Sequence, residues 1–320
     1  MSLQENLNDS YPSHEGLMLD YEEALTRTFA LPPALQQHQI SNAPLIPGLQ
    51  GEQISSLDGG SSRLQNSSAT ADQARTKQGF TGFYNTSAHF LWIGDRTRQL
   101  DGAHIEYFRG IRNPIGAKVG PSMRADELLK LIEILNPDRE PGRLTLITRY
   151  GAGKIEEHLP GHIAAVQQSG VPVIWVCDPM HGKWVLRSQL ISLYTQKHID
   201  STLTSASGLK TRNFSTIVSE VTSCLRIHSE CNSKLNGVSL EFTGELSDDG
   251  FSVTECLGGS MELSEEELEL RYQSFCDPRL NFEQSLDLAF LLSNHFKKER
   301  RGHSKADRHA NLEAAFSSRR

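Results

Sequence analysis

Short apolar runs alternate with amphipathic stretches through the middle of the chain. The run at 171–176, Val-Pro-Val-Ile-Trp-Val, is rich in β-branched and aromatic side chains, and Gly170 precedes it. Such a run is typical of a strand buried on both faces of a parallel sheet that lies beneath helices. It stops on a polar turn, so Asp178 and His181 are expected at the carboxyl end of the strand. Ligands and metals bind at that edge of parallel sheets and barrels.

The same kind of pattern predicts further strands and helices. Besides 171–176, strands are expected at 87–94, 116–121, 144–149 and 237–244. Helices are expected at 11–27, 125–135 and 154–168, after a cap at Asn213, and after the capping pairs Ser264–Glu267 and Asn281–Gln284, the last running to about 296. The alternation of strand and helix indicates an α/β fold with a parallel sheet of about five core strands.

Other segments lack a sustained period and set the predicted organisation. We expect a short amino-terminal segment with a helix at 1–27, a disordered or inserted segment at 28–85, and an ordered domain at 86–298. An insertion at about 183–207, with two β-like runs that have no clear partner, interrupts this domain. Residues 299–320, rich in Lys and Arg, are expected to form a solvated tail.

Composition narrows the class of protein. A net charge of −7 argues against a broad nucleic-acid-binding face, although a local cation cluster could still bind phosphate. No apolar run reaches membrane-spanning length, and the amino terminus lacks the apolar core of a secretion signal. The five cysteines show no C-x-x-C spacing, so neither a disulfide framework nor a zinc knuckle is indicated. We expect a cytoplasmic protein that binds neither nucleic acid nor membranes.

Two sets of polar residues lie at predicted strand ends. The cations Lys118, Arg149 and Arg96 could converge on a phosphate or carboxylate. The second set, His181, Glu241 and Asp277, offers one nitrogen and two carboxylates, which suit a divalent metal such as manganese. Each residue alone has a simpler interpretation, because cations at strand ends are usually solvated and Glu241 could cap a neighbouring helix.

Several long blocks of the sequence resemble one family. They lie at 87–104, 112–121, 136–149, 177–182, 209–214, 253–259 and 276–281, and include Ser-Ala-His-Phe-Leu-Trp-Ile-Gly-Asp-Arg-Thr-Arg and Cys-Asp-Pro-Met-His-Gly. In this order they closely resemble the class II 3-deoxy-D-arabino-heptulosonate 7-phosphate (DAHP) synthases. The resemblance covers about 11–27, 86–182 and 208–298. It implies a (β/α)8 TIM barrel that condenses phosphoenolpyruvate with erythrose 4-phosphate, the first step of the shikimate pathway to chorismate and the aromatic amino acids.

The resemblance also implies roles for single residues. By position in the blocks, His181, Glu241 and Asp277 are similar to the family's metal ligands, with Mn2+ expected and Co2+ or Cd2+ as alternatives. The phosphoenolpyruvate contacts would be Asp95, Arg96, Lys118 and Arg149, of which Lys118 and Arg149 would act in catalysis together with His181. Asp95 departs from the family pattern, in which Glu is common at this place.

The resemblance leaves part of the family pattern without a counterpart. Its amino-terminal blocks, which carry a cysteine metal ligand and a phosphate-binding segment, are not found here, and the matched core is shorter than the roughly 200 residues of a complete barrel. We therefore expect a carboxy-terminal portion with an incomplete barrel, arising from a truncated gene product or a wrong reading frame.

Other functions stay open at this point. The chain could be a catalytically inactive homologue that acts as a regulatory or interaction subunit, a gene-prediction fragment, or a different metal-dependent aldolase on the same barrel. Its expected partners are the two small-molecule substrates, with a homo-oligomer or an association with a full-length synthase also possible.

Overall fold

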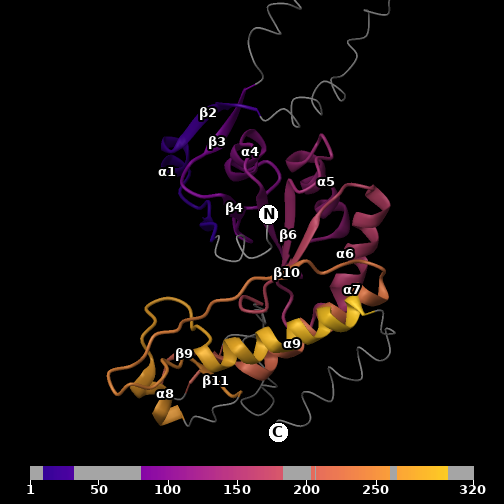
Figure 1. Ribbon diagram of the computed structural model, residues 1–320. Coiled ribbons are helices and arrows are strands. Elements are labelled where there is room, and N and C mark those ends of the chain that lie inside the picture. Colours follow the sequence, from indigo (N-terminus) through magenta and orange to yellow (C-terminus); the bar gives the residue numbers. More distant parts are fainter. Residues whose placement is uncertain (1–9, 32–80, 183–202, 206, 260–264, 302–320) are drawn as a thin grey trace, which may run out of the picture.

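A computed structural model describes residues 10–31, 81–182, 203–205, 207–259 and 265–301 (Figure 1). Its largest sheet has six strands in the order β1-β4-β5-β6-β7-β10, and every neighbouring pair is parallel. The strands are β1 Ser13–Glu15, β4 Phe90–Ile93, β5 Ile115–Val119, β6 Leu144–Thr148, β7 Ile174–Cys177 and β10 Gly237–Val238. The sheet curls into a half-barrel, so an α/β fold with a partial TIM-like barrel is confirmed.

Helices connect the central strands in βα order. Between the strands run α4 Ala103–Gly110, α5 Ala125–Leu135, α6 Ile155–Ser169 and α7 Phe214–Glu230. Figure 1 shows α5, α6 and α7 following one another along one side of the sheet. This is the arrangement that right-handed parallel crossovers produce.

Smaller elements flank the main sheet. One two-stranded antiparallel sheet pairs β2 Thr26–Ala30 with β3 Thr81–Asn85. A three-stranded sheet has the order β11-β9-β8, with bounds Cys256–Leu257, Lys210–Asn213 and Leu203–Thr204. The remaining helices are α1 Leu19–Ala24, α8 Glu265–Arg271 and α9 Phe282–Arg300. Figure 1 shows β9, β11 and α8 together in a lobe below the main sheet.

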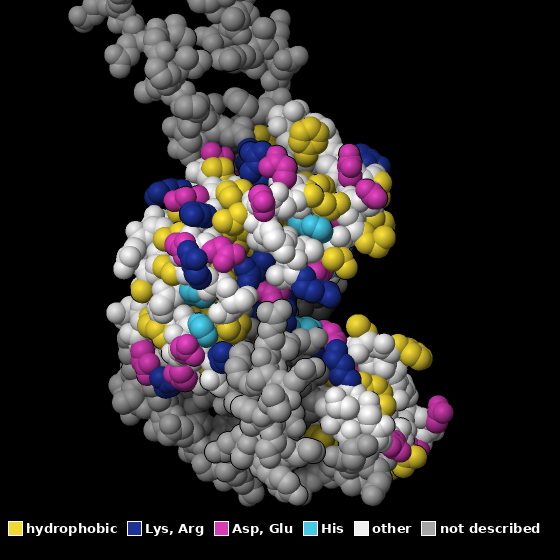
Figure 2. Space-filling model, turned by 180° about the vertical axis from the view of Figure 1, so that it is seen from behind, with side chains coloured by type: hydrophobic (Ala, Val, Ile, Leu, Met, Phe, Trp, Pro, Cys, Tyr) yellow, Lys and Arg dark blue, Asp and Glu magenta, His cyan; other side chains and the backbone are white. Residues whose placement is uncertain are grey.

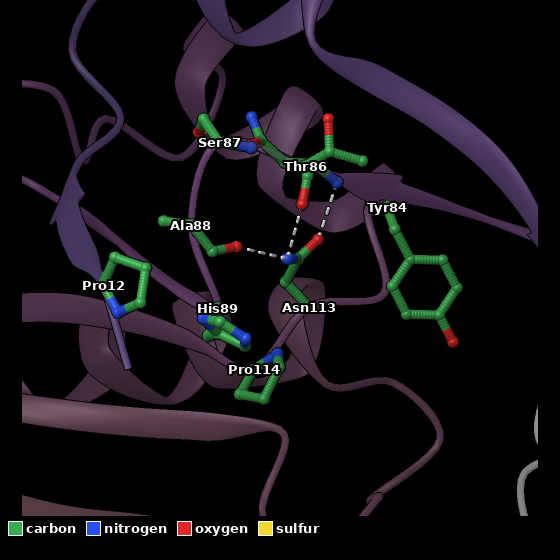
Figure 3. A pocket seen from close by; sticks show the side chains of 9 residues that line it. Pro12, Tyr84, Thr86, Ser87, Ala88, His89, Asn113 and Pro114 are labelled. Carbon is green, nitrogen blue, oxygen red and sulfur yellow. Dashed lines mark hydrogen bonds between the residues drawn. The ribbon is translucent and has the colours of Figure 1, made fainter. Parts of the chain in front are cut away.

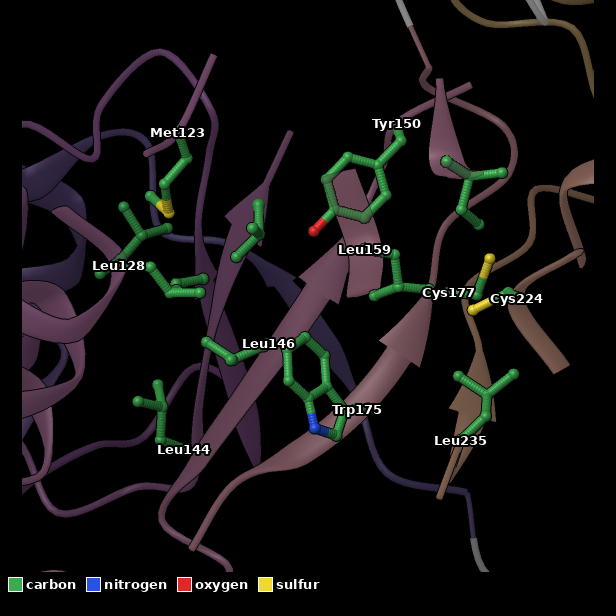
Figure 4. Close-up of a cluster of buried hydrophobic side chains, with 14 of the residues drawn as sticks. Met123, Leu128, Leu144, Leu146, Tyr150, Leu159, Trp175, Cys177, Cys224 and Leu235 are labelled. Atoms are coloured by element: carbon green, nitrogen blue, oxygen red, sulfur yellow. The ribbon is translucent and has the colours of Figure 1, made fainter. Parts of the chain in front are cut away.

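The core lies between the curled sheet and its helices. Every residue of β5 and β6 is buried. The inner face of α5, with Leu128, Leu131, Ile132 and Leu135, is buried as its sequence period predicts. Figure 4 shows this cluster continuing past Trp175 to Cys177, Cys224 and Leu235. Burial of apolar side chains on both faces of the central strands supplies most of the driving force that fixes strand order.

Most central elements agree with the pattern-based predictions. The strands expected at 87–94, 116–121, 144–149 and 171–176 are present, somewhat shorter or shifted, as are the helices at 125–135 and 154–168. Asn213 caps α7 by accepting a hydrogen bond from Ser215 N at 2.9 Å. Asn281 and Gln284 form the predicted capping box of α9. Ser264, the expected cap of α8, lies outside the described residues.

The amino-terminal segment differs from the helix predicted at 11–27. Only Leu19–Ala24 is helical, and the apolar residues Leu17 and Tyr21 are exposed. The buried residue of α1 is Glu22, whose carboxylate bonds His14 and Asn85 at 2.8 and 2.6 Å. Polar pairing, which leaves no helical apolar period, therefore anchors this segment. It also contributes β1, so the parallel sheet has six strands and not the five predicted.

Three other expectations need correction. Strands β2 and β3 reach into the two ends of the segment 28–85, which was predicted to lack structure, while 32–80 lies outside the described residues. The basic residues at 210–212, whose polar sequence favours a turn, instead belong to strand β9, because pairing with β8 and β11 overrides the local sequence. Of the strand predicted at 237–244, only Gly237–Val238 joins the sheet.

The structure describes only part of the predicted insertion and of the predicted tail. Residues 183–202 and 302–320 lie outside the described part of the chain, and α9 extends through Arg300 into the predicted tail. Among the described helices, none is long and apolar enough to cross a membrane.

A buried histidine sits between β7 and the end of α7. His228 is 1 % exposed, and its ring lies edge-on to Trp175 with 5.5 Å between centroids. Its Nδ1 is 2.9 Å from Ser233 Oγ, while Nε2 has no hydrogen-bond partner among the described residues. Burial lowers the pKa of His228 to about 4.

This pKa predicts a loss of stability in acid. The unfolded chain takes up a proton at His228 near the ordinary value of 6.5, whereas the folded protein does so only near 4. The contribution is therefore complete above pH 6.5 and is lost as the pH falls toward 4, by on the order of 3 kcal/mol. We expect H228Q to show a shallower decline of the free energy of unfolding between pH 6.5 and 4, measured by urea denaturation.

The same change at an exposed histidine, H89Q, controls for the loss of an imidazole. Identical pH dependence in H228Q and H89Q would contradict the burial effect.

Candidate functional site

The carboxyl ends of three central strands carry the residues that the sequence singled out. Lys118 is the last residue but one of β5, Arg149 directly follows β6, and His181 follows β7 after a short turn. The register pairs the last residue of each of these strands with the last residue of its neighbour. Parallel pairing therefore places the three side chains at one edge of the sheet, as predicted.

His181 forms a cluster with two carboxylates from distant parts of the chain. Its Nε2 lies 2.7 Å from Glu241 Oε1 and 3.5 Å from Asp277 Oδ2. Glu241 belongs to the extended segment after β10, and Asp277 to the loop before α9. The two segments are joined by a parallel bridge between Phe242 and Leu280.

The geometry of this cluster fits a divalent metal ion. One ligand atom from each of His181, Glu241 and Asp277 can be chosen so that all three lie within 4.8 Å of one another. An imidazole nitrogen with two carboxylate oxygens is a ligand set that manganese and similar ions accept. All three side chains are partly exposed, so an ion and a substrate could reach them.

Asp178 links the histidine to the neighbouring lysine. Its side chain is fully buried, and both of its oxygens lie 2.9 Å from His181 Nδ1. Lys118 Nζ donates to Asp178 Oδ2, and Met180 N donates to Oδ1 at 3.0 Å. Because Asp178 occupies Nδ1, the Nε2 atom of His181 is directed to Glu241 and Asp277. A carboxylate behind a histidine in this way is a common means of orienting a metal ligand.

Charge interactions dominate the protonation of this group. Burial opposes ionisation of Asp178, but its bond to His181 and the charge of Lys118 hold its pKa well below the ordinary value. Burial likewise opposes the charged form of His181, yet its bonds to Asp178 and Glu241 raise its pKa to about 9. A protonated His181 therefore adds a further positive charge among the surrounding carboxylates.

Arg149 lies on the other side of His181. Its guanidinium donates to the carbonyl oxygen of His181 and lies 3.9 Å from Asp95 Oδ2. Asp95 follows β4, so this strand also contributes a side chain to the edge formed by β5, β6 and β7. Lys118 also lies 5.6 Å from the centre of the Trp92 ring, a cation–π distance.

Arg96 does not join this arrangement. Its side chain is exposed, and within the described part of the chain no ion pair involves it. The partner of Asp95 is instead Arg98, which is buried and lies 2.9 Å from Asp95 Oδ1 and 3.1 Å from Glu127. A predicted role of Arg96 in binding a substrate stays untested.

Two cations that sequence reasoning left without a role lie against the metal cluster. Lys210 donates to Asp277 Oδ1, and Arg212 lies 3.5 Å from Glu241 Oε2 and 3.9 Å from Asp277 Oδ1. Arg212 is fully buried, with its Nε 2.8 Å from Met180 O. Burial opposes ionisation of Asp277, but the hydrogen bond from Lys210 lowers its pKa. The sequence did contain a signal for them. Lys210 and Arg212 are separated by one residue, so in an extended strand their side chains lie on the same face.

The loop that carries Asp277 is fixed by a buried carboxylate. Glu255 is fully buried, and its Oε2 accepts from Arg279 N at 2.7 Å and Arg279 Nε at 3.0 Å. Ser274 Oγ also donates to Asp277 O at 2.8 Å. These contacts hold the backbone of the loop, so Asp277 reaches His181 without help from a regular element.

The surface has a notch where charged side chains gather. Figure 2 shows it at one edge of the molecule, with Lys or Arg, Asp or Glu and His side chains around it. Such mixed charge is what an anionic substrate and a metal ion together would require.

A separate cavity lies at the opposite ends of the strands. It has a volume of about 350 Å³ and is lined by residues that precede β1, β4 and β5, among them Pro12, His89 and Pro114 (Figure 3). Asn113, which also lines it, donates to the carbonyl oxygens of Asn85 and Ala88 at 2.9 and 3.1 Å. Among the described residues that line it there is no Asp, Glu, Lys or Arg, so the charged edge is the stronger candidate active site.

Comparison with known proteins gives a consistent result. The Class-II DAHP synthetase family model matches residues 2–293. A Neurospora crassa phospho-2-dehydro-3-deoxyheptonate aldolase is 45% identical over 91% of this chain and 49% of its own length. Phospho-2-dehydro-3-deoxyheptonate aldolases from Streptomyces coelicolor and Mycolicibacterium smegmatis are 39% and 38% identical, over 90% and 88% of this chain and 48% and 47% of their own lengths. The chain thus spans about half the length of the curated relatives it matches. The match over most of the chain establishes that this protein belongs to the class-II DAHP synthetase family.

Proposed function

We propose that this chain acts as a phospho-2-dehydro-3-deoxyheptonate aldolase. In this reaction C3 of phosphoenolpyruvate bonds to the aldehyde carbon of D-erythrose 4-phosphate, a water oxygen adds at C2, and phosphate leaves. The relatives, which are named phospho-2-dehydro-3-deoxyheptonate aldolases, support the proposal. The observation that carries it is Asp178, which joins Lys118, a candidate phosphoenolpyruvate contact, directly to His181 of the candidate metal cluster.

The cations would bind the enol phosphate. Arg149 offers a planar guanidinium suited to two hydrogen bonds with a phosphate or carboxylate. Lys118 brings a compact positive charge from the adjacent strand, and Asp95 orients Arg149 from the side. Holding phosphoenolpyruvate between β5 and β6 would direct its C3 toward the His181 edge, which lowers the entropic part of the barrier.

His181, Glu241 and Asp277 would hold a divalent ion, and we take Mn2+ as the expected ion with Co2+ or Cd2+ as alternatives. A divalent ion bound there supplies Lewis-acid polarisation of an aldehyde oxygen. The chain's own part is to present Nε2 of His181 as a free nitrogen, which Asp178 secures from the other side of the ring. Lys210 pairs with Asp277, and Arg212 lies 3.5 Å from Glu241 Oε2, so the two cations orient the two carboxylates.

The finer features of the prediction are part of this proposal. We take the half-barrel as part of a (β/α)8 barrel, aligned with the carboxy-terminal portion of the longer relatives, in a cytoplasmic protein. The matched blocks at the strand ends support this alignment. A different metal-dependent aldolase is disfavoured by the extent of the family match.

The reaction itself is tested by phosphate release. We expect the wild-type chain to release phosphate from phosphoenolpyruvate only when erythrose 4-phosphate and Mn2+ are both present. Removing the buried charge in K118M should lower kcat/KM by about 100-fold or more, because it removes electrostatic binding at a partly desolvated edge. Phosphate release, with circular dichroism as a check of folding, measures this.

The exposed lysine on α5 offers a matched control, K130M, which should keep wild-type activity. A folded wild-type protein that binds phosphoenolpyruvate and Mn2+ without turnover would instead favour an inactive homologue with a regulatory or interaction role. Equal activity in K118M and K130M would contradict the role of Lys118.

Metal binding is tested separately. We expect H181A to weaken Mn2+ binding by about 100-fold or more, and D178N by about 10–100-fold, because Asp178 orients the ligating ring. Electron paramagnetic resonance of free Mn2+ measures both dissociation constants. H89A, which removes a histidine at the opposite ends of the strands, is the control. Unchanged Mn2+ affinity in H181A would show that the cluster is not the metal site.

A further inference from the structure

A buried glutamate of α7 lies directly beneath the loop that carries Arg149. Glu220 is 1 % exposed, on a helix whose inward face is otherwise mostly apolar. Its Oε1 accepts hydrogen bonds from Tyr150 N at 3.1 Å and from Gly151 N at 2.9 Å. Two successive peptide NH groups thus converge on one carboxyl oxygen.

The loop held by Glu220 has little freedom elsewhere. Arg149 N donates to Val119 O at 2.8 Å, which continues the ladder between β5 and β6. At the next residues the backbone turns, with a φ of +83° at Gly151 that favours glycine. A Cβ added at Gly182 would lie 2.6 Å from both N and Cα of Gly151, so this loop and the His181 loop are in close backbone contact. Glu220 holds the side of this loop that faces α7, through Tyr150 N and Gly151 N.

An uncharged carboxyl suits this position. Burial raises the pKa of Glu220 to about 8, against the effect of its two hydrogen bonds from the backbone. At neutral pH the group therefore satisfies two buried NH donors without adding a negative charge beside a pocket meant for an anion. Its second oxygen, Oε2, is buried without a hydrogen-bond partner among the described residues and lies 3.5 Å from the Cβ position at Gly182.

We propose that Glu220 is a positioning residue that sets the direction of the Arg149 guanidinium by holding the two peptide groups that follow it. The inference rests on the proposed function, in which Arg149 binds phosphoenolpyruvate. Glu220 acts on the cation side of the site, because the His181 ring has its own support in Asp178. Loss of Glu220 should therefore affect phosphoenolpyruvate more than the metal ion.

Calorimetric binding of phosphoenolpyruvate and of Mn2+ to the whole chain tests this separation. In E220A two buried NH groups lose their acceptor, so we expect phosphoenolpyruvate to bind about 10-fold or more weakly while the Mn2+ affinity changes by less than about 2-fold. E220Q keeps an acceptor of the same shape and should restore phosphoenolpyruvate binding to within about 3-fold of wild type. Glu230, an exposed glutamate on the same helix, gives the control E230A, which should bind both like wild type.

Hydrogen–deuterium exchange of the peptide containing Tyr150 and Gly151 gives a readout that needs no ligand. Faster exchange in E220A than in E220Q and E230A is expected. If E220A does not fold, E220D takes its place, because its shorter side chain moves the carboxyl oxygen away from the two NH groups. We expect E220D to show the same weaker phosphoenolpyruvate binding and faster exchange, but to a smaller extent.

Several results would overturn the inference. A folded E220A or E220D that binds phosphoenolpyruvate as tightly as wild type would do so, as would equal losses of phosphoenolpyruvate and Mn2+ affinity, which indicate general destabilisation. Wild-type protein that binds Mn2+ but no phosphoenolpyruvate would contradict the proposed function, and is distinguished from these by the wild-type titration alone.

Discussion

The buried carboxylate of Asp178 is the interaction on which the arrangement of the site depends. An ionised carboxylate with no exposure is costly unless it is paired and hydrogen-bonded. Here the partners are Lys118 from β5, the ring of His181 and the peptide NH of Met180. Removing Lys118 or the His181 ring would weaken the compensation of this interior charge. Asp178 thus ties His181, which follows β7, to Lys118 on β5, two strands away in the sheet. The loop that carries His181 would not fix its position in this way by itself.

This coupling explains why two different kinds of ligand group meet at one edge. The cations belong to central strands or follow them directly, and their separation is set by the register of β5, β6 and β7. The carboxylates Glu241 and Asp277 come from extended segments outside the main sheet. His181 contacts both sets, through Asp178 on one side of the ring and Nε2 on the other. The sheet therefore determines the anion-binding half, whereas loop contacts determine the metal-binding half.

The same division decides how much could be predicted from the sequence. The central strands and α5 follow from apolar patterns because burial dominates there. Lys118, Arg149 and His181 followed from their places at strand ends, and Glu241 and Asp277 became specific only through resemblance to a family. The misses have local causes. The strand at Ser13–Glu15 has no apolar pattern, and its side-chain anchor is the polar contact of His14 with Glu22.

Buried polar groups were the hardest to predict. Glu220 lies three positions after Ile217 and four before Cys224, so its place on the inward face of α7 was readable, but its hydrogen-bond partners were not. The partners Tyr150 and Gly151 are far away in sequence and offer only backbone groups. No side-chain pattern identifies such a contact. Arg212 is similar, because Met180 and Pro278, which accept from it, contribute only carbonyl oxygens.

Arg212 also shows how the metal-binding half keeps its shape. A fully buried guanidinium requires negative partners, and Glu241 and Asp277 lie within ion-pair distance of it. Its hydrogen bonds to the carbonyl oxygens of Met180 and Pro278 join the His181 turn to the Asp277 loop. The two carboxylates are therefore held at the cluster by a cation that is not itself exposed to substrate. Neither of these two loops belongs to the main sheet. Arg212 therefore fixes the two loops relative to each other, as strand register fixes the cation-bearing strands on the other side of His181.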